Sequence, residues 1–188
     1  MQTDALQGGF PNPPVDAAHA FRAAMTAMAR PGHISRVTGG LPPAPLSVAA
    51  GVLALTLCDP ETPVYLAGAA DCPAVRDWIT FHTGAPFLQA RNCAFAIGTW
   101  DALQPLDAYP VGTAEYPDRS ATLIVEVPEL SDRGARLTGP GIRDEAQLTL
   151  PNIDAFRLNA ARFPLGWDCF LTFGDTLAAL PRTTKVGA

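Results

Sequence analysis

The sequence is poor in lysine, and this scarcity excludes one class of enzyme. Lys185 is the one lysine among 188 residues, and it lies near the C-terminus in the segment Thr183-Thr184-Lys185. Pyridoxal phosphate enzymes need a lysine that forms a Schiff base with the cofactor in a buried site. A lysine in a C-terminal tail is poorly placed for that, so the sequence predicts no pyridoxal chemistry and no cofactor.

Charge and long apolar runs are also scarce. Charged residues make up 16% of the chain, the net charge is −5, and the basic residues are scattered singly. Proteins that bind nucleic acid cluster their basic residues on one face, so we expect no nucleic-acid partner. No apolar run reaches the ~18 residues that a membrane span needs. Residues 1–10 lack the features of a signal peptide, and we therefore expect a cytoplasmic protein without a membrane partner.

Side chains that bind metals or act as nucleophiles are present but scattered. The three histidines His19, His33 and His82 lie far apart, and neither Cys-x-x-Cys nor His-x-x-x-His occurs. The Gly-x-Ser-x-Gly elbow of many hydrolases is absent as well. We expect no disulfide among the four cysteines, because thiols stay reduced in the cytoplasm. We also expect no iron–sulfur site, because the cysteines are widely spaced. They are Cys58, Cys72, Cys93 and Cys169.

What the chain does have is apolar residues. Hydrophobic residues make up 48% of the sequence and charged residues 16%, so the chain is more apolar and less charged than an average soluble domain. The abundance of alanine explains part of this share, and a surface that a partner covers is the other explanation. The length suits one domain spanning residues 1–188, which needs neither disulfide nor metal to fold.

Apolar spacing predicts helices in the first half of the chain and more strands in the second. Phe21, Met25 and Met28 repeat at helical spacing after Pro13-Pro14, and Arg30-Pro31-Gly32 ends that helix. Asp71 is expected to cap a helix that carries Pro73 in its first turn. The other helices are expected at 46–58 and 152–163, and strands at 34–38, 62–66, 93–97, 121–127, 135–137, 147–150, 168–173 and 177–180. This order predicts an α/β fold with a mixed β-sheet flanked by helices.

One glycine-rich turn is a candidate phosphate site. Gly139, Pro140 and Gly141 follow an expected strand, where backbone N–H groups could face an anion. Asp144 stands where the third glycine of Gly-x-Gly-x-x-Gly belongs, and Pro140 removes one donor. A rigid turn at the end of a strand is the competing interpretation.

Six segments in register make the chain resemble a known family. It is similar to the PhnH family of the bacterial carbon–phosphorus lyase system, which breaks down phosphonates, over nearly the whole length from residue 10 onward. Each segment alone is weakly specific, but together they are specific. They are Phe21–Met25 with Ala27–Gly32, Phe81–Pro86, Gly112 with Tyr116-Pro117 and Ser120–Thr122, Leu137–Ile142, Phe163–Gly166 with Asp168, and Leu180–Thr184.

The resemblance implies a fold and a set of partners. The family's fold is similar to the large domain of PLP-dependent transferases, without PLP. Its members act with carbon–phosphorus lyase subunits G, I and J in an assembly that attaches phosphonate to the ribose C1 of ATP and displaces adenine. Isolated members form homodimers, and the family offers no catalytic residue to transfer to this sequence.

Two functional hypotheses follow. In the first, the protein is an accessory, non-catalytic component of that assembly, and its surface serves a partner. In the second, it binds a phosphorylated ligand, a nucleotide or a phosphonate, in a vestigial cofactor cleft, using the glycine turn and the arginines Arg30, Arg143 and Arg182. As ligand or partner contacts we name Arg30, His82 and Arg182 together with the turn Gly139, Pro140 and Gly141. Helix capping and loop anchoring are the alternative roles for these side chains, and for His82 a favourable position at the end of a helix.

Overall fold

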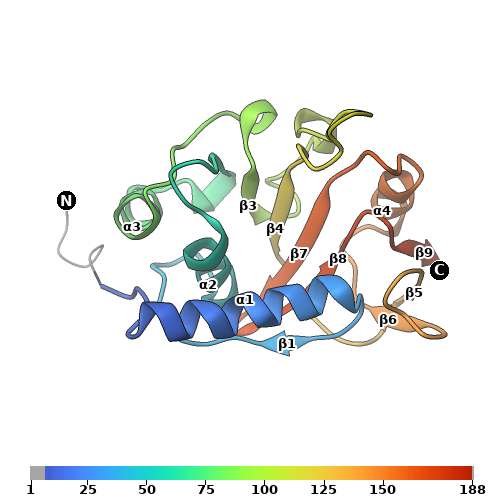
Figure 1. Ribbon diagram of the computed structural model, residues 1–188, viewed down its shortest axis with the longest axis horizontal. Coiled ribbons are helices and arrows are strands. Elements are labelled where there is room, and N and C mark those ends of the chain that lie inside the picture. Colours follow the sequence, from blue (N-terminus) through green and yellow to red (C-terminus); the bar gives the residue numbers. More distant parts are fainter. Residues whose placement is uncertain (1–6, 188) are drawn as a thin grey trace.

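The computed structural model describes residues 7–187, which form three layers with a twisted sheet in the middle (Figure 1). Helices α1 (Pro13–Ala29), α2 (Val48–Leu57) and α3 (Pro73–Thr83) cover one face of this sheet. A small second sheet and helix α4 (Ile153–Ala160) cover the other face. The α/β class and the mixed sheet flanked by helices are therefore confirmed.

The central sheet has six strands in the order β1-β8-β7-β4-β3-β2. Strands β2, β3, β4 and β7 run parallel to one another, whereas β8 is antiparallel to β7 and β1 is antiparallel to β8. Strand β7 thus lies between a strand that precedes it and a strand that follows it in the chain. The six strands are β1 (Ser35–Arg36), β2 (Val64–Leu66), β3 (Phe95–Thr99), β4 (Thr122–Glu126), β7 (Asp168–Phe173) and β8 (Thr176–Leu180).

Side chains alternate between the two faces of the sheet, and both faces are buried. On β4, Ile124 points to the layer of α1, α2 and α3, and its neighbours Leu123 and Val125 point to the opposite layer. Two hydrophobic cores result, one on each side of the sheet. Strands buried on both faces read as nearly continuous apolar runs, which explains why residues 121–127 give the clearest strand pattern in the sequence.

The helices start where the sequence provides a cap or a proline. They are α1 (Pro13–Ala29), α2 (Val48–Leu57), α3 (Pro73–Thr83) and α4 (Ile153–Ala160), with short 3-10 turns at Gly68–Ala70, Ala90–Asn92 and Leu106–Ala108. The Asn152 side chain accepts a hydrogen bond from the Ala155 N–H at 3.0 Å and so caps α4. Ser47 caps α2 in the same way, so this helix starts two residues after the predicted position.

The predicted cap of α3 is wrong. Cys72 occupies the capping position without a side-chain hydrogen bond, and the carboxylate of Asp71 instead pairs with the guanidinium of Arg76. That pair lowers the pKa of Asp71 and raises the pKa of Arg76, chiefly through the hydrogen bond between the two side chains. Pro73 does lie in the first turn of the helix, as expected.

The predicted C-terminal tail is also wrong, because its last residues form a strand. Strand β9 (Lys185–Gly187) pairs antiparallel with β5 (Ala135–Thr138), which also pairs with β6 (Ala146–Leu148). Leu137 and Leu148 of this small sheet are fully buried against the central sheet. Three residues are too few to show a strand pattern in the sequence, and only the pairing with β5 defines them.

A half-buried carboxylate joins the central sheet to the start of α2. Glu126, the last residue of β4, accepts hydrogen bonds from the Ser47 N–H at 2.7 Å and from the Thr172 hydroxyl at 3.0 Å. Burial raises the pKa of the Glu126 carboxyl above its ordinary value of 4.5, although these hydrogen bonds oppose the rise.

Replacing Glu126 with glutamine is expected to flatten the dependence of stability on pH. A carboxyl whose pKa is higher in the folded state than in the unfolded state loses stabilising free energy as the pH rises from 4.5 through the folded value. The Glu126→Gln variant lacks this loss and keeps an acceptor for Ser47. Urea unfolding of both proteins from pH 4.5 upward measures the free energy of unfolding. The difference, variant minus wild type, should increase as the pH rises. A constant difference between the two would contradict the assignment.

Candidate functional site

The structure places the site residues named from the sequence in three separate regions. Arg30 lies just after α1, close to the turn Gly139–Gly141. His82 lies in the last turn of α3. Arg182 follows β8 and lies near Asp168 at the start of β7. The structure therefore brings Arg30 together with the glycine turn, but it keeps His82 and Arg182 apart from them.

Arg182 is the centre of a hydrogen-bond network. Its Nε donates to one carboxylate oxygen of Asp168 at 3.2 Å, and its Nη2 donates to the other at 2.6 Å. Its Nη1 donates to the carbonyl oxygen of Pro117 at 2.7 Å and to that of Pro164 at 3.5 Å. Nη2 also donates to the hydroxyl of Ser120, and the backbone N–H of Arg182 donates to Asp168 at 2.8 Å.

All five N–H donors of the Arg182 guanidinium thus have acceptors inside the protein. The side chain is 11% exposed and that of Asp168 is 25% exposed, so this ion pair is largely shielded from water. The network ties together segments that carry the family resemblance, although they are far apart in the sequence. Arg182 acts here as a brace between loops, and it offers no free donor to a phosphate.

A shallow hollow of about 370 Å³ lies over this brace. Phe163 forms part of its wall and is 60% exposed. Three of the other lining residues are proline, and proline side chains add apolar surface without donors. The lining residues are Pro117, Asp118, Phe163, Pro164, Asp168, Pro181, Arg182 and Thr183. A surface of this composition suits contact with another apolar surface better than the binding of a charged ligand.

Next to the brace, Thr184 buries a hydroxyl without a hydrogen-bond partner among the described residues. The residue is 3% exposed. An unsatisfied buried polar group destabilises a protein by about 1–3 kcal/mol.

Thr184→Val is therefore expected to raise the free energy of unfolding by about 1 kcal/mol, because valine keeps the shape and removes the hydroxyl. Thr172→Val is the matched control. The Thr172 hydroxyl is also buried, but it has acceptors within reach, the Val125 carbonyl at 3.2 Å and the Glu126 carboxylate at 3.0 Å, so its loss should destabilise the protein. Urea denaturation measures the change in the free energy of unfolding for both variants, which should be positive for Thr184→Val and negative for Thr172→Val. Destabilisation by Thr184→Val would show that its hydroxyl has a partner.

His82 fastens the segment before α1 to α3. Its ring lies edge-on to the rings of Trp78 and Phe81, with centroids 5.2 Å and 4.9 Å away. Its Nε2 lies 3.4 Å from the carbonyl oxygen of Gln7, which also accepts a hydrogen bond from the Trp78 indole at 3.0 Å. The position at the end of a helix is as predicted, and the contacts anchor a loop.

The turn Gly139–Gly141 packs against the end of α1. A side chain at Gly141 would overlap the carbonyl oxygen of Ala29, and the backbone there has φ +79°. The Ile142 N–H donates to the Gly139 carbonyl at 3.1 Å, which closes the turn. The turn therefore follows β5 as predicted, and its contacts are those of a rigid connection that fixes the end of α1.

Helix α1 exposes Phe21 and Met25, two of the three large apolar residues of its sequence repeat, whereas the third, Met28, packs against the core. The residues that it buries are the alanines Ala20, Ala24 and Ala27. Phe21 is 48% exposed and Met25 is 56% exposed. Helical spacing alone does not show which side of a helix faces the core. The signal that would have shown it is the neighbouring row of alanines, since small residues allow close packing.

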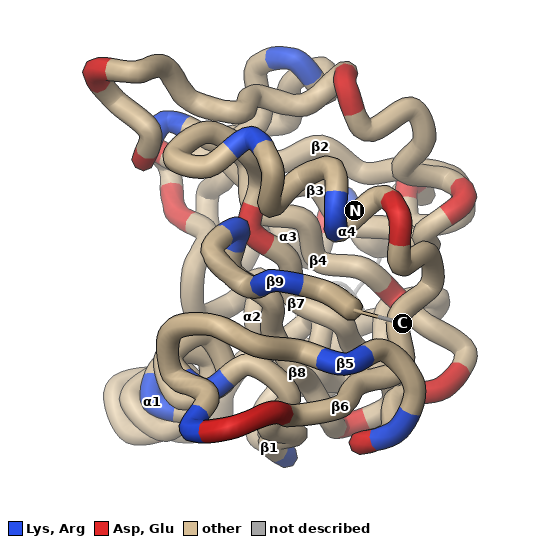
Figure 2. Tube along the Cα trace, turned by 90° about the vertical axis from the view of Figure 1, so that its right-hand side faces the viewer, with Lys and Arg blue, Asp and Glu red and all other residues tan. Residues whose placement is uncertain are grey.

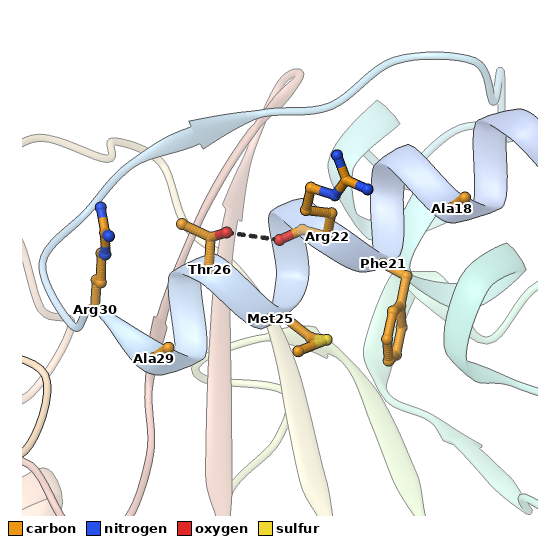
Figure 3. Close-up of a pocket in the computed structure, with 7 residues that line it drawn as sticks. All are labelled: Ala18, Phe21, Arg22, Met25, Thr26, Ala29 and Arg30. Atoms are coloured by element: carbon orange, nitrogen blue, oxygen red, sulfur yellow. Dashed lines mark hydrogen bonds between the residues drawn. The ribbon is translucent and has the colours of Figure 1, made fainter.

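The outward face of α1 lines a hollow of about 650 Å³, at whose end Arg30 lies (Figure 3). Phe21 and Met25 point to one side of the helix, whereas Arg22 and Arg30 point to the other. We call this the α1 face and define it by Ala18, Phe21, Arg22, Met25, Thr26, Ala29 and Arg30. It combines an apolar edge with a basic edge.

The buried thiols are not set up as nucleophiles. Burial raises the pKa of Cys58 and of Cys93 to about 12, and it raises the pKa of Cys169 as well. Burial likewise raises the pKa of the Tyr109 hydroxyl. All four cysteines are free. Within residues 7–187 there is no group of three or more histidine, cysteine or carboxylate side chains that could hold a metal ion.

Charge is mixed over the face that the small sheet presents. Figure 2 shows basic and acidic positions interspersed around β5, β6 and β9, without a stripe of one sign there. This arrangement is unlike the continuous basic surface of nucleic-acid-binding proteins. In the part of the chain that the structure describes, no helix has both the length and the apolar character needed to cross a membrane.

Comparison with known proteins gives a family match and two curated relatives. The family model described as bacterial phosphonate metabolism protein (PhnH) matches residues 8–187. The alpha-D-ribose 1-methylphosphonate 5-triphosphate synthase subunit PhnH of Rhizobium meliloti (strain 1021) is 42% identical over 195 residues, covering 98% of this chain and 97% of that protein. The putative C-P lyase subunit protein HtxG of Stutzerimonas stutzeri is 31% identical over 174 residues, covering 89% and 84% of the two chains.

Proposed function

Because the chain belongs to the PhnH family of bacterial phosphonate metabolism proteins, we propose that it serves as an accessory, non-catalytic subunit of a carbon–phosphorus lyase complex. The reaction of that complex attaches phosphonate to the ribose C1 of ATP and displaces adenine. In this proposal another subunit performs the displacement, and this chain supplies surface.

One observation carries the proposal: two polar side chains in the segments of the family resemblance, Arg182 and His82, make contacts within the protein, whereas large apolar side chains are left exposed. The guanidinium of Arg182 is fully hydrogen-bonded within the protein, and His82 holds a loop. Phe21, Met25 and Phe163 are instead about half exposed or more. Exposed apolar patches rimmed by polar residues are typical of protein–protein contact sites.

We further propose that the partners are subunits G, I and J in the cytoplasm and that the isolated protein is a homodimer. Residues 1–188 form one domain whose fold is that of the large domain of PLP-dependent transferases, without PLP. The exposed position of Lys185 at the start of β9 supports the proposal that the protein binds no PLP, since a lysine that holds PLP must face a buried site.

The alternative, a module that binds a nucleotide or phosphonate, has less support. Of the three arginines it needs, Arg182 has no donor left, and Arg143 is 97% exposed. Arg30 lies near the glycine turn, but Pro140 has no N–H there and Gly141 is packed against α1. Calorimetry with ATP and with methylphosphonate tests this alternative, and heat at millimolar ligand would favour it.

Co-purification tests the proposed function directly. The tagged protein is expressed together with subunits G, I and J, and the retained chains are identified after washing. Retention of the three subunits in fixed proportion is the expected result. The proposal fails if the tagged protein retains none of them when all four chains are present.

A further inference from the structure

Helix α1 leaves two of its large apolar side chains exposed, unlike an ordinary surface helix. Such a helix turns its large apolar residues towards the core and its polar residues towards water. In α1 the fully buried residues are alanines, with the half-buried Met28 packed against the core as well, and the helix lies against β8 and α2. Phe21 and Met25 lie beside this buried stripe and are about half exposed, and Ala18 and Ala29 on the exposed side add little bulk. Two large side chains therefore project from this part of the helix.

Charge on the α1 face has one sign. Arg22 and Arg30 border the apolar edge, and all seven residues that define the face are apolar, basic or threonine. The protein as a whole carries a net charge of −5, so a purely basic border is a local departure from its average. A complementary surface would carry carboxylates in the matching positions.

We propose that the α1 face is the docking surface for another polypeptide, which presents an apolar ridge bordered by aspartate or glutamate side chains. This inference rests on the accessory role proposed above and names the surface that performs it. Phe21 and Met25 would be the buried anchors, since large, well-packed apolar side chains dominate binding energy. Arg22 and Arg30 would pair with carboxylates at the rim and set the orientation.

A second copy of this chain is a poor occupant of the face. An antiparallel pairing that sets Phe21 over Met25 of the other copy has its twofold axis at residue 23, because 21 + 25 equals 2 × 23. The two Arg22 residues would then lie only about 3 Å apart along the helix axis. This arrangement sets like charges against each other, whereas a partner with carboxylates neutralises them.

The experiment compares variants for binding to subunits G, I and J prepared together by co-expression. Phe21→Gln/Met25→Gln removes the anchors, and Arg22→Glu reverses the charge. Leu158→Gln on α4 is the matched apolar control, because Leu158 is 66% exposed, and Arg143→Glu is the charge control. All four variants change exposed positions, so the midpoints of urea unfolding should stay close to that of the wild type.

We expect each α1 variant to bind at least about tenfold more weakly, which corresponds to the loss of one ordinary anchor, and both controls to bind like the wild type. Added salt should weaken the wild type more than Arg22→Glu. Wild-type binding that the α1 variants leave intact would overturn the docking surface and spare the proposed function. Absence of binding by the wild type would overturn both.

The size of the isolated variants in solution gives a further outcome. If Phe21→Gln/Met25→Gln turned a dimer into a monomer and still bound the other chains at full strength, the α1 face would be a contact between two copies and the inference would be wrong. An unchanged oligomeric state with weakened binding supports a different partner chain.

Discussion

Replacing Arg182 with methionine is expected to lower the free energy of unfolding by about 3 kcal/mol. The change leaves Asp168 without its cation in a largely shielded position, and it removes the donors to the Pro117 and Pro164 carbonyls. Breaking a buried ion pair by removing one partner destabilises a protein by about 3–5 kcal/mol, and the residual exposure of both side chains places the effect at the lower end. Urea denaturation followed by tryptophan fluorescence measures it.

Arg143→Met is the matched control for this prediction. Arg143 is also an arginine beside an aspartate, but it is 97% exposed and its Nε lies 3.9 Å from Asp144. Exposed pairs contribute about 0–1 kcal/mol, so this variant should unfold nearly like the wild type. Equal stability of the Arg182 variant and this control would mean that Arg182 is not a brace, and its donors would then be available to a ligand.

Gly141→Ala is expected to destabilise the protein by a similar amount, about 3 kcal/mol. Two causes add up. The backbone at Gly141 has φ +79°, a conformation that costs residues with a side chain about 1–2 kcal/mol. In addition, the new methyl group would overlap the Ala29 carbonyl oxygen at the end of α1, so that the turn or the helix has to move.

Gly174→Ala separates these two causes. Gly174 also has a left-handed backbone, with φ +58°, but a methyl group there would meet nothing within 4 Å. We therefore expect a loss of about 1 kcal/mol, from backbone strain alone. The difference between the two variants measures how firmly the glycine turn is packed against α1. If both lost the same amount, the turn would be free of α1, and the interpretation as a phosphate-binding loop would gain support.

The sequence predicted the elements well and their environment less well. The strand at 121–127 and the helix after Pro13-Pro14 were found because an apolar run and a helical repeat are local signals. The direction of the Phe21 and Met25 stripe was not predictable from them, because it depends on which side of α1 meets β8. Periodicity shows that side chains share a face, and only the packing shows whether the face is covered.

The candidate site shows the same limit. Arg182 was named because it lies in one of the six segments, but its partners are 14 to 65 residues away in the sequence. Nothing in the spacing of Pro117, Ser120 and Asp168 indicates that their oxygens converge on one guanidinium. The separation of Arg30 from Arg182 was likewise beyond sequence patterns, since it follows from where β8 ends and α1 ends in the fold.

The strand order has a consequence for how the protein is made. Strand β7, at residues 168–173, fills the place between β4 and β8, and β1 at residues 35–36 gains its neighbour only when residues 176–180 have been synthesised. A ribosome therefore carries an incomplete sheet with open edges until late in translation. Nascent chains of this protein should depend on chaperones that shield unpaired strands, and mild truncations from the C-terminal side should aggregate instead of yielding a smaller folded domain.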